Sequence, residues 1–330
     1  MKNEIVSIVV PTFNAGLYID ECLESLICQT YENIEIVVVN DGSTDNTKNI
    51  VEEFVNKDKR IRLINTENRG VSSARNIGMK ARSKQGFFMF IDADDRMMPT
   101  AIEDLKKILD MYDADIVDGY SVTGKYGERK DKYIPSERII KIWDGEQTIK
   151  KCLSDAPEIS SCWAKLYRKK IIKNVFFDED IRVHEDRFFI FKCALEKPKF
   201  VSANEFIYQY NNTPNSASKS SFSEKWFDIL DVAEREKNII NDTFPHLAKW
   251  VCLNDLKMHM ILLRLLSKNF NFKYYNIEKK CLKLFKENKK YFISSRRGDN
   301  EWFKILSYKL YYLVKLRNWL KFILHKQRKK

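Results

Sequence analysis

Short apolar runs rich in β-branched residues alternate with segments of helical spacing along the first 120 residues. The apolar runs lie at residues 5–10, 34–39, 61–64, 87–91 and 115–117. Several of them are continuously apolar, as expected of strands that are covered on both faces. Helical spacing occurs around residues 17–29, 44–56, 71–84 and 99–112. This alternation predicts an α/β fold with a mostly parallel, doubly wound sheet.

The pattern changes twice after this region. From about residue 120 to 215 it is less regular and contains a charged stretch at residues 125–138. Beyond residue 216 it is mostly helical and rich in lysine, leucine and aromatic residues. The sequence contains no internal repeat, and no long Gly/Ser or Pro linker separates these regions. We therefore expect a helical C-terminal extension that is packed on the α/β part or continuous with it.

The net charge is concentrated at one end of the chain. The 330 residues carry a formal charge of +12, which by itself suggests a nucleic-acid partner. Residues 1–250 have a net charge of −4, however, and residues 251–330 have a net charge of +16. No stacking platform or helix-turn-helix pattern accompanies this basic region, so we expect no nucleic-acid partner.

The basic region contains a predicted amphipathic helix at residues 302–326. Its apolar side chains fall within about 100° of arc at helical periodicity, whereas Lys315 and four other basic residues lie elsewhere. Such a helix can lie in the headgroup region of an anionic membrane, or it can pack on the α/β part with its lysines in water. We favour contact with the membrane surface, because Lys-rich polar faces are typical of surface-binding helices.

The cysteines and the apolar segments bear on the compartment. Seven cysteines form an odd set with no Cys-x-x-Cys pair and no zinc-like grouping with the four histidines, which favours thiols in a reducing compartment. No window of 18 apolar residues predicts a membrane-spanning helix, and the first apolar run is too short for a signal-peptide core. We therefore expect a cytoplasmic protein that is peripheral on the inner face of the cell membrane.

Polar clusters follow three of the predicted strands. PTFN at residues 11–14 follows the first strand, NDGS at 40–43 follows the second, and DADD at 92–95 follows the fourth. In doubly wound sheets, ligands bind outside the carboxyl ends of the strands. The three clusters are therefore expected to converge on one ligand site.

The carboxylates of the last cluster need neutralisation. Asp92, Asp94 and Asp95 would repel one another unless a cation or hydrogen-bond donors neutralise them. A hard cation such as Mg²⁺ or Mn²⁺ takes one or two carboxylates and fills its other positions with water and phosphate oxygens. The simpler interpretation is a turn in which Asp95 or a neighbour caps the helix that begins near Pro99. The Asp-x-Asp tripeptide alone favours the capped turn, and the neighbouring clusters favour the cation.

Two further segments have both a structural and a functional interpretation. Residues 41–45 form a tight glycine turn and a helix cap, or Asp41 accepts a hydrogen bond from a nucleotide base. Residues 67–76 form a loop that opens a helix, or they place Arg75 and backbone donors beside a diphosphate. Each segment alone leaves both interpretations open.

Together these residues resemble glycosyltransferase family 2, which has the GT-A fold. The resemblance rests on the order and spacing of SIVVPTFN at 7–14, NDGSTD at 40–45, ENRG and SARNIG at 67–78, and FIDADD at 90–95. Residues 163–167 and 185–189 are similar to motifs of the family's second half. The resemblance covers roughly residues 4–217. It implies a catalytic domain at 1–217, with a nucleotide-sugar-binding half at 1–120 and an acceptor half at 121–217, followed by a helical basic region at 218–330.

The resemblance also implies a reaction: inverting transfer from a nucleotide-sugar, usually a UDP-sugar, to a hydroxyl of a glycan or lipid-linked acceptor in surface polysaccharide synthesis. Mn²⁺ or Mg²⁺ would be held by Asp94 and Asp92. Asp186 would be the general base, a role for which Glu185 competes. Inversion is one in-line displacement, which needs a base at the acceptor oxygen and an electrophile at the departing diphosphate. The matched positions around the nucleotide are Pro11, Thr12, Asn14, Asp41, Asn68, Arg75 and Asp92.

Some alternatives stay open. Trp163 and Lys165 either shape a substrate pocket or are a core tryptophan with a solvated neighbour. Relatives tend to have an arginine after a Tyr-x-Tyr strand where this chain has YQYN at 208–211, so a phosphate contact there would need Ser216 or Lys219 instead. The alternative function is a non-catalytic protein that binds a nucleotide-sugar or a lipid. A nucleotidyltransferase is disfavoured because residues 11–16 offer one glycine for a phosphate loop.

Overall fold

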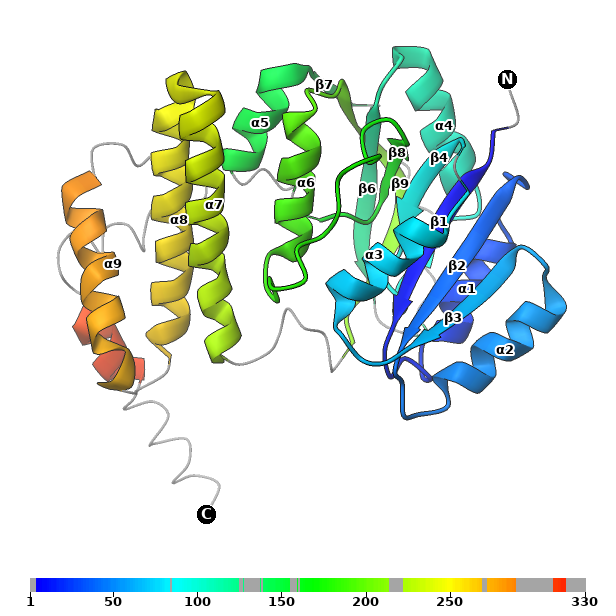
Figure 1. Cartoon of the computed structure of the whole chain (residues 1–330), viewed down its shortest axis with the longest axis horizontal. Helices are drawn as coiled ribbons and strands as arrows, with labels where there is room; N and C mark the ends of the chain where they lie inside the picture. Colours follow the sequence, from blue (N-terminus) through cyan, green and yellow to red (C-terminus); the bar gives the residue numbers. More distant parts are fainter. Residues whose placement is uncertain are drawn as a thin grey trace. The chain divides into compact units, whose positions relative to one another are not determined.

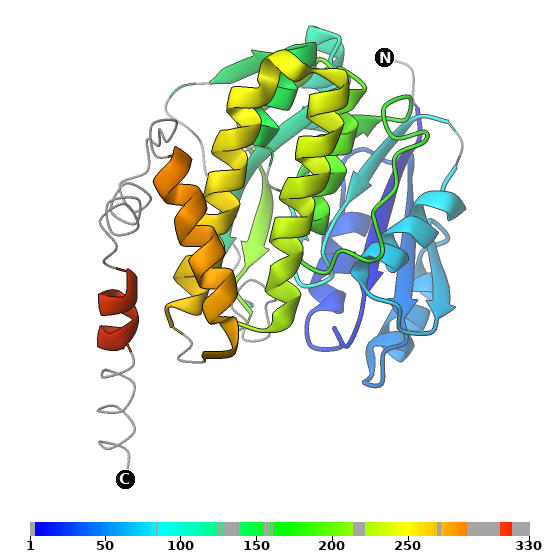
Figure 2. The same cartoon turned by 60° about the vertical axis from the view of Figure 1, so that its left-hand side comes forward.

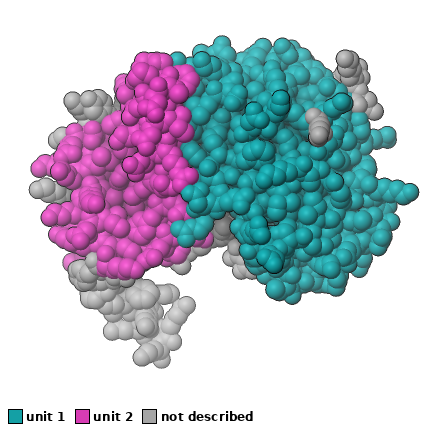
Figure 3. Space-filling view, in the orientation of Figure 1, with its two compact units in different colours: residues 1–152, 156–220 teal, residues 153–155, 221–330 magenta. Residues whose placement is uncertain are grey.

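The computed structural model describes residues 4–83, 85–124, 127, 137, 139–154, 159, 161–213, 222–268, 272–288 and 311–318. The chain divides into two compact units, which Figure 3 distinguishes by colour: residues 1–152 with 156–220, and residues 153–155 with 221–330. The domain boundaries expected from the sequence stay predictions.

One sheet forms the centre of the first unit (Figure 1). Among the described residues it has nine strands, in the order β3-β2-β1-β4-β8-β6-β9-β5, and β7 pairs with β9. The strands are β1 Val6–Thr12, β2 Ile34–Asp41, β3 Ile61–Thr66, β4 Phe87–Phe90, β5 Arg96–Met97, β6 Ile116–Gly124, β7 Ile140–Trp143, β8 Lys165–Arg168 and β9 Phe200–Asn211.

The two halves of this sheet differ in strand direction. Strands β3, β2, β1 and β4 are parallel, as the alternating pattern predicts. Strand β8 then runs antiparallel to both β4 and β6, and β6 is parallel to β9. The predicted α/β fold is confirmed, but the sheet is mixed rather than mostly parallel: the described strands form four parallel and four antiparallel pairs. The antiparallel pairs lie in the half where the sequence pattern is irregular.

The predicted helices of the first unit are present with shifts of a few residues at their ends. The helix expected around residues 44–56 begins three residues later, because Asp45 accepts a hydrogen bond from the Thr47 amide at 3.0 Å and so precedes the first turn. The helices are α1 Ile19–Ile27, α2 Thr47–Lys57, α3 Val71–Ala81, α4 Ala101–Tyr112, α5 Gly145–Leu153 and α6 Glu185–Leu195.

Helices cover both faces of the sheet, which explains the continuously apolar strands. Buried side chains of α1, α2 and α4 form one apolar cluster with Ile8 and Val38 on one face. Helix α3 lies on the other face, where a Cβ added at Gly78 would be 2.4 Å from a methyl of Val9. The absence of a side chain at Gly78 therefore allows α3 to pack closely on β1.

Helices make up the described part of the second unit. Helices α7 (Asp228–Thr243), α8 (Ala248–Leu266) and α9 (Tyr275–Asn288) are joined by short 3₁₀ turns, and a further helical segment spans residues 311–318 (Figure 2). The predicted helical C-terminal extension is confirmed. Within the described ranges, no helix combines the length and the apolar character that crossing a membrane requires. The 3₁₀ turns are Glu224–Phe227, Pro245–Leu247 and Phe272–Tyr274.

Candidate active site

A cavity of about 580 Å³ in the first unit lies where β1 and β4 end. Its described walls come from the loop after β1, the first turns of α3 and α6, the turn after β4, the loop before β8 and the end of β9. Three strand ends and two helix starts therefore meet here, as the doubly wound topology predicts. The predicted site residues that line it are Pro11, Asn14, Arg75, Asp92, Asp94, Glu185 and Asp186.

Three predicted nucleotide contacts are outside this lining. Thr12 is buried, and its hydroxyl donates to the Val10 carbonyl at 3.4 Å. Both carboxylate oxygens of Asp41 accept backbone N–H groups, from Arg69 at 2.9 Å and from Gly70 at 2.8 Å. Asp41 therefore fastens the loop that precedes α3 to the end of β2, and the contacts of Thr12 and Asp41 with a nucleotide stay predictions.

Asn68 belongs to the loop that Asp41 holds. Gly42, with a φ of +72°, makes room for it, because a Cβ at Gly42 would lie 2.7 Å from the Asn68 backbone nitrogen. The Asn68 side chain is exposed, and its predicted contact with the nucleotide also stays a prediction.

The turn after β4 carries two carboxylates, Asp92 and Asp94, into the cavity. The Arg75 guanidinium donates to Asp92 Oδ1 at 3.1 Å, and the Thr213 hydroxyl donates to Asp94 Oδ2 at 3.1 Å. Burial, followed by the charge of Asp92, raises the pKa of Asp94 above its usual value, and the Thr213 hydroxyl opposes this. The two carboxylates are thus only partly neutralised by the protein.

Asp95 has a structural role that the sequence did not reveal. It accepts hydrogen bonds from the Tyr208 hydroxyl at 2.6 Å and the Asn211 amide at 2.8 Å, and it is almost fully buried. The interpretation that Asp95 or a neighbour caps the following helix is wrong, because α4 begins at Ala101 with no side-chain cap. Asp95 instead joins the acidic turn to β9.

The donor set of the turn fits a hard divalent cation. Asp92 and Asp94 offer carboxylate oxygens to one cavity. Burial, and then the charge of Asp92, raise the pKa of Asp94, and a bound cation would oppose both effects. The described residues contain no group of three or more His, Cys, Asp or Glu side chains arranged for a metal. Mg²⁺ takes one or two carboxylates and completes its shell with water and phosphate, whereas a structural zinc site needs four protein ligands. Binding of Mn²⁺ or Mg²⁺ stays a prediction.

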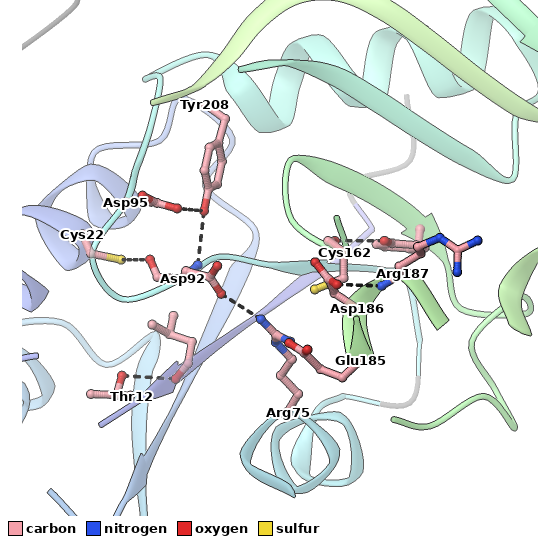
Figure 4. A network of polar contacts seen from close by, with 12 residues as sticks. Thr12, Cys22, Arg75, Asp92, Asp95, Cys162, Glu185, Asp186, Arg187 and Tyr208 are labelled. Carbon is pink, nitrogen blue, oxygen red and sulfur yellow. Dashed lines mark hydrogen bonds and ion pairs between the residues drawn. The ribbon is translucent and has the colours of Figure 1, made fainter. Parts of the chain in front are cut away.

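Arg75 links the two acidic walls of the cavity (Figure 4). One guanidinium nitrogen donates to Asp92 at 3.1 Å and another donates to Glu185 at 3.0 Å. The guanidinium also lies 5.1 Å from the ring centroid of Phe177, which buries it. One positive charge thus serves two carboxylates, the first on the turn after β4 and the second at the start of α6.

Glu185 and Asp186 line the cavity from the first turn of α6. His184 precedes them in a left-handed conformation, with a φ of 67°. Burial, and then Arg187, lower the pKa of His184 to about 3, so this imidazole is neutral near pH 7. Glu185 is paired with Arg75, whereas Asp186 accepts the Arg187 amide at 2.7 Å. Burial, and then the Glu185 carboxylate, raise the pKa of Asp186 to about 7.

The end of β9 supplies residues that sequence reasoning did not assign. Trp163 lines the cavity and stacks on Tyr208 and Tyr210, with ring centroids 4.7 Å and 5.8 Å away. The Asn211 side-chain amide donates to the Asp94 carbonyl at 2.8 Å, so the residue after Tyr210 supports the acidic turn. Polar residues that follow a strand were the available signal for Asn211 and Thr213. The suggested substitutes, Ser216 and Lys219, lie outside the described residues.

Sequence comparison identifies relatives of the whole first unit. The chain matches the profile described as Glycosyl transferase family 2 over residues 7–231. It is 34% identical over 260 residues to glycosyltransferase GlyA of Streptococcus pneumoniae serotype 4, which covers 75% of this chain and 37% of GlyA. It is also 34% identical over 223 residues to the uncharacterized glycosyltransferase EpsJ of Bacillus subtilis, covering 65% of this chain and 63% of EpsJ. The chain thus spans less than two thirds of these two relatives.

A solved structure with the same fold contains a nucleotide-sugar. The crystal structure of S. aureus TarS 1–349 in complex with UDP-GlcNAc matches 94% of this chain and 90% of that chain, with a TM-score of 0.69 at 21% identity. The similarity shows that this chain has the fold of TarS.

Proposed function

Because the chain belongs to glycosyltransferase family 2 and has the GT-A fold, we propose that it transfers a sugar from a nucleotide-sugar to a hydroxyl of a glycan or lipid-linked acceptor. The observation that carries this proposal is one cavity with two different acidic walls. Asp92 and Asp94 form a partly neutralised pair, and Asp186 is a separate carboxyl whose pKa of about 7 suits a general base. The complex of TarS with UDP-GlcNAc supports a UDP-sugar as the donor.

The nucleotide diphosphate would lie between the turn after β4 and the start of α3. Val71 opens α3 and lines the cavity, so the first amides of that helix are available to phosphate oxygens. Arg75 adds a buried positive charge on the same side. Asp94 and Asp92 would hold Mn²⁺ or Mg²⁺, which when bound neutralises charge on the departing diphosphate.

The acceptor hydroxyl would approach from the α6 side. Asp186 would remove its proton while the acceptor oxygen forms a bond to the anomeric carbon and the bond from that carbon to the diphosphate breaks. One such displacement inverts the configuration of the anomeric carbon. Glu185 is the weaker candidate for the base, because Arg75 neutralises its carboxylate at 3.0 Å.

A donor panel tests this proposal. Purified protein with Mn²⁺ would be incubated with UDP- and GDP-sugars, and mass spectrometry would detect the released nucleotide and the glycosylated product. We expect release from one class of UDP-sugar and its loss in Asp94→Asn and Asp186→Asn variants. Full activity in both variants would refute the site, and binding of donors without turnover would favour the non-catalytic alternative.

We further propose that the second unit contacts an anionic membrane surface. Tyr312, Leu313 and Leu316 of the 311–318 helix are 41%, 62% and 44% exposed, and Tyr275 of α9 lies beside Tyr312 with ring centroids 6.1 Å apart. Helix α9 also exposes lysines that would favour anionic headgroups. These are Lys279, Lys280, Lys283 and Lys286.

One detail of the predicted amphipathic helix is corrected. Lys315 was expected on the polar face, but it is buried and its ammonium contacts Glu278 Oε1 at 2.5 Å, as does the Tyr311 hydroxyl at 2.8 Å. Leu313 and Leu316 are exposed on the helix face opposite Tyr311 and Lys315. The rest of the predicted 302–326 helix lies outside the described residues.

Flotation with vesicles tests the membrane proposal. The full chain should float with phosphatidylglycerol vesicles at physiological salt, and the Leu313→Asp/Leu316→Asp double variant should not. Met111→Asp, which changes a 65% exposed residue of α4, is the matched control and should still float. Equal flotation of the double variant, or preferential binding of duplex DNA by the wild type, would contradict the proposal.

A further inference from the structure

A second cavity, of about 430 Å³, lies in the first unit where β6 and β9 separate. The two strands pair as far as Asp118 and Ser202, and pairing resumes only at Tyr120 and Phe206. Strand β9 also pairs with β7 over Phe200–Ala203, so Ala203 has a partner in β7, Ile140, and none in β6. The volume falls within the range of about 300–1,000 Å³ that is usual for small-molecule sites.

The floor of this cavity is polar and buried. Asp118 pairs in register with Lys165 on one side and with Ser202 on the other, so the three side chains share one face of the sheet. The Lys165 ammonium donates to Asp118 Oδ1 at 2.8 Å, and the Ser202 hydroxyl donates to Asp118 Oδ2 at 3.2 Å. Of the two interpretations of Lys165 that the sequence left open, the solvated neighbour is wrong, because the side chain is 1% exposed and lines this cavity.

Lys165 retains hydrogen-bonding capacity that the described residues do not use. Its ammonium has three N–H donors, and its contacts there are with Asp118 and with the Trp163 carbonyl at 3.4 Å. Because Asp118 balances the charge, the floor offers hydrogen bonds without a net charge. Such a floor can hydrogen-bond the hydroxyls of a neutral polyol, and the exposed Lys141 is the one further charged residue of the described lining.

The wall between the two cavities contains both an aromatic ring and a hydroxyl. Trp163 and Ser161 line the second cavity as well as the first. Ser161 is 9% exposed, and its hydroxyl has no hydrogen-bond partner within the described part of the chain. Tyr120 adds a second aromatic side chain to the lining and is 42% exposed. Aromatic faces and hydrogen-bonding groups together match the apolar faces and the hydroxyls of a sugar ring.

We propose that the second cavity binds a sugar or polyol unit of the acceptor, next to the unit whose hydroxyl is glycosylated beside Asp186. This inference rests on the proposed transfer reaction. The reacting unit would occupy the first cavity, and the shared wall of Trp163 and Ser161 would separate it from its neighbour. The enzyme therefore prefers acceptors of at least two units over single sugars.

Tyr120→Ala and Ser202→Ala test the inference in the full chain. Acceptor KM would be measured with p-nitrophenyl glycosides of one and of two sugars (glucose, galactose and their N-acetylated amines). We expect each variant to raise KM about tenfold for the disaccharides, the effect of one lost contact, and to leave KM for the monosaccharides unchanged. Met111→Ala is the matched surface control, and its KM values should equal those of the wild type for both acceptor lengths.

Two further readouts separate this inference from the reaction on which it rests. Donor hydrolysis by water needs no acceptor, so its rate should be the same in the wild type and in both variants. Saturation-transfer NMR should detect the disaccharides on the wild type and not on Tyr120→Ala, with or without turnover. Absence of any donor hydrolysis would refute the proposed function alone, whereas equal KM changes for both acceptor lengths, or unchanged disaccharide binding, would refute the second site.

Discussion

The two acidic walls of the first cavity differ in how their charge is balanced. The turn after β4 presents Asp92 and Asp94 with one guanidinium contact and one hydroxyl contact between them. At the start of α6, Glu185 accepts a hydrogen bond from the other guanidinium nitrogen of Arg75. Asp186 accepts a hydrogen bond from a backbone amide and has a pKa of about 7. The first wall thus suits a bound cation and the second suits an exchangeable proton. Similar side chains acquire different chemistry from their surroundings.

The largest expected effect comes from removing only the proposed general base. Asp186→Asn keeps the shape of the side chain but cannot accept a proton, so we expect transfer to fall about 10²–10⁴-fold. Donor affinity, measured by calorimetry with Mn²⁺, should stay at the wild-type value. Glu185→Gln is the matched variant, and a larger loss of rate there than in Asp186→Asn would reverse the assignment of the base.

The next test removes a carboxylate of the proposed cation site. Asp94→Asn should raise the Mn²⁺ concentration for half-maximal rate by at least the roughly 10–100-fold that the loss of an outer-shell partner costs. Titration of the rate with Mn²⁺ at saturating donor measures this. A variant that responds to Mn²⁺ like the wild type, or a wild type that keeps full activity in EDTA, would remove the distinction between the walls.

Arg75 allows the coupling between the walls to be measured. A general base acts in its ionised form, so the transfer rate should rise as the pH increases through about 7, the pKa of Asp186, and level off above it. Burial and the Glu185 carboxylate raise that pKa, whereas the Arg75 charge lowers it. Arg75→Met should therefore move the midpoint of the pH profile upwards, whereas Arg60→Met, which removes an arginine bound to Asp58, should not. An unchanged or lower midpoint for Arg75→Met would show that the walls are independent.

The smallest expected effect concerns a side chain that holds the turn of the proposed cation site in place. Tyr208→Phe removes the hydroxyl that donates to Asp95 and accepts the Asp92 amide, so the free energy of unfolding should fall by about 1–3 kcal/mol. Urea denaturation measures the loss. Tyr112→Phe, at a hydroxyl with no hydrogen bond among the described residues, is the control, and equal stability of both variants would contradict the role of Tyr208.

The sequence predicted the parallel half of the fold because that half is encoded locally. The apolar runs of β1, β2 and β4 are covered on both faces, and each of these three strands ends in a polar cluster that the topology brings to one edge. The predicted ligands Asp92 and Asp94 and the predicted bases Glu185 and Asp186 accordingly line one cavity. Their chemical roles stay predictions that the variants above address.

The remaining features depend on partners far away in the chain. Asp41 is held by amides 28 and 29 residues later, and Lys315 is buried by Glu278, 37 residues earlier. Helical periodicity predicted Lys315 on the polar face of its helix, because periodicity contains no information about Glu278. The antiparallel strand β8 and the second cavity likewise arise from pairing between segments whose own patterns are irregular.

The hydrogen bonds of Asp95 determine how late in synthesis the acidic turn can form. Its partners Tyr208 and Asn211 follow it by 113 and 116 residues, so the ribosome must synthesise more than half of the chain before the acidic turn can close. Loop closure over such separations slows folding. A fragment of the first 120 residues would contain the polar clusters at 11–14, 40–43 and 92–95 and still lack both partners of Asp95. During translation the nascent protein passes through that state.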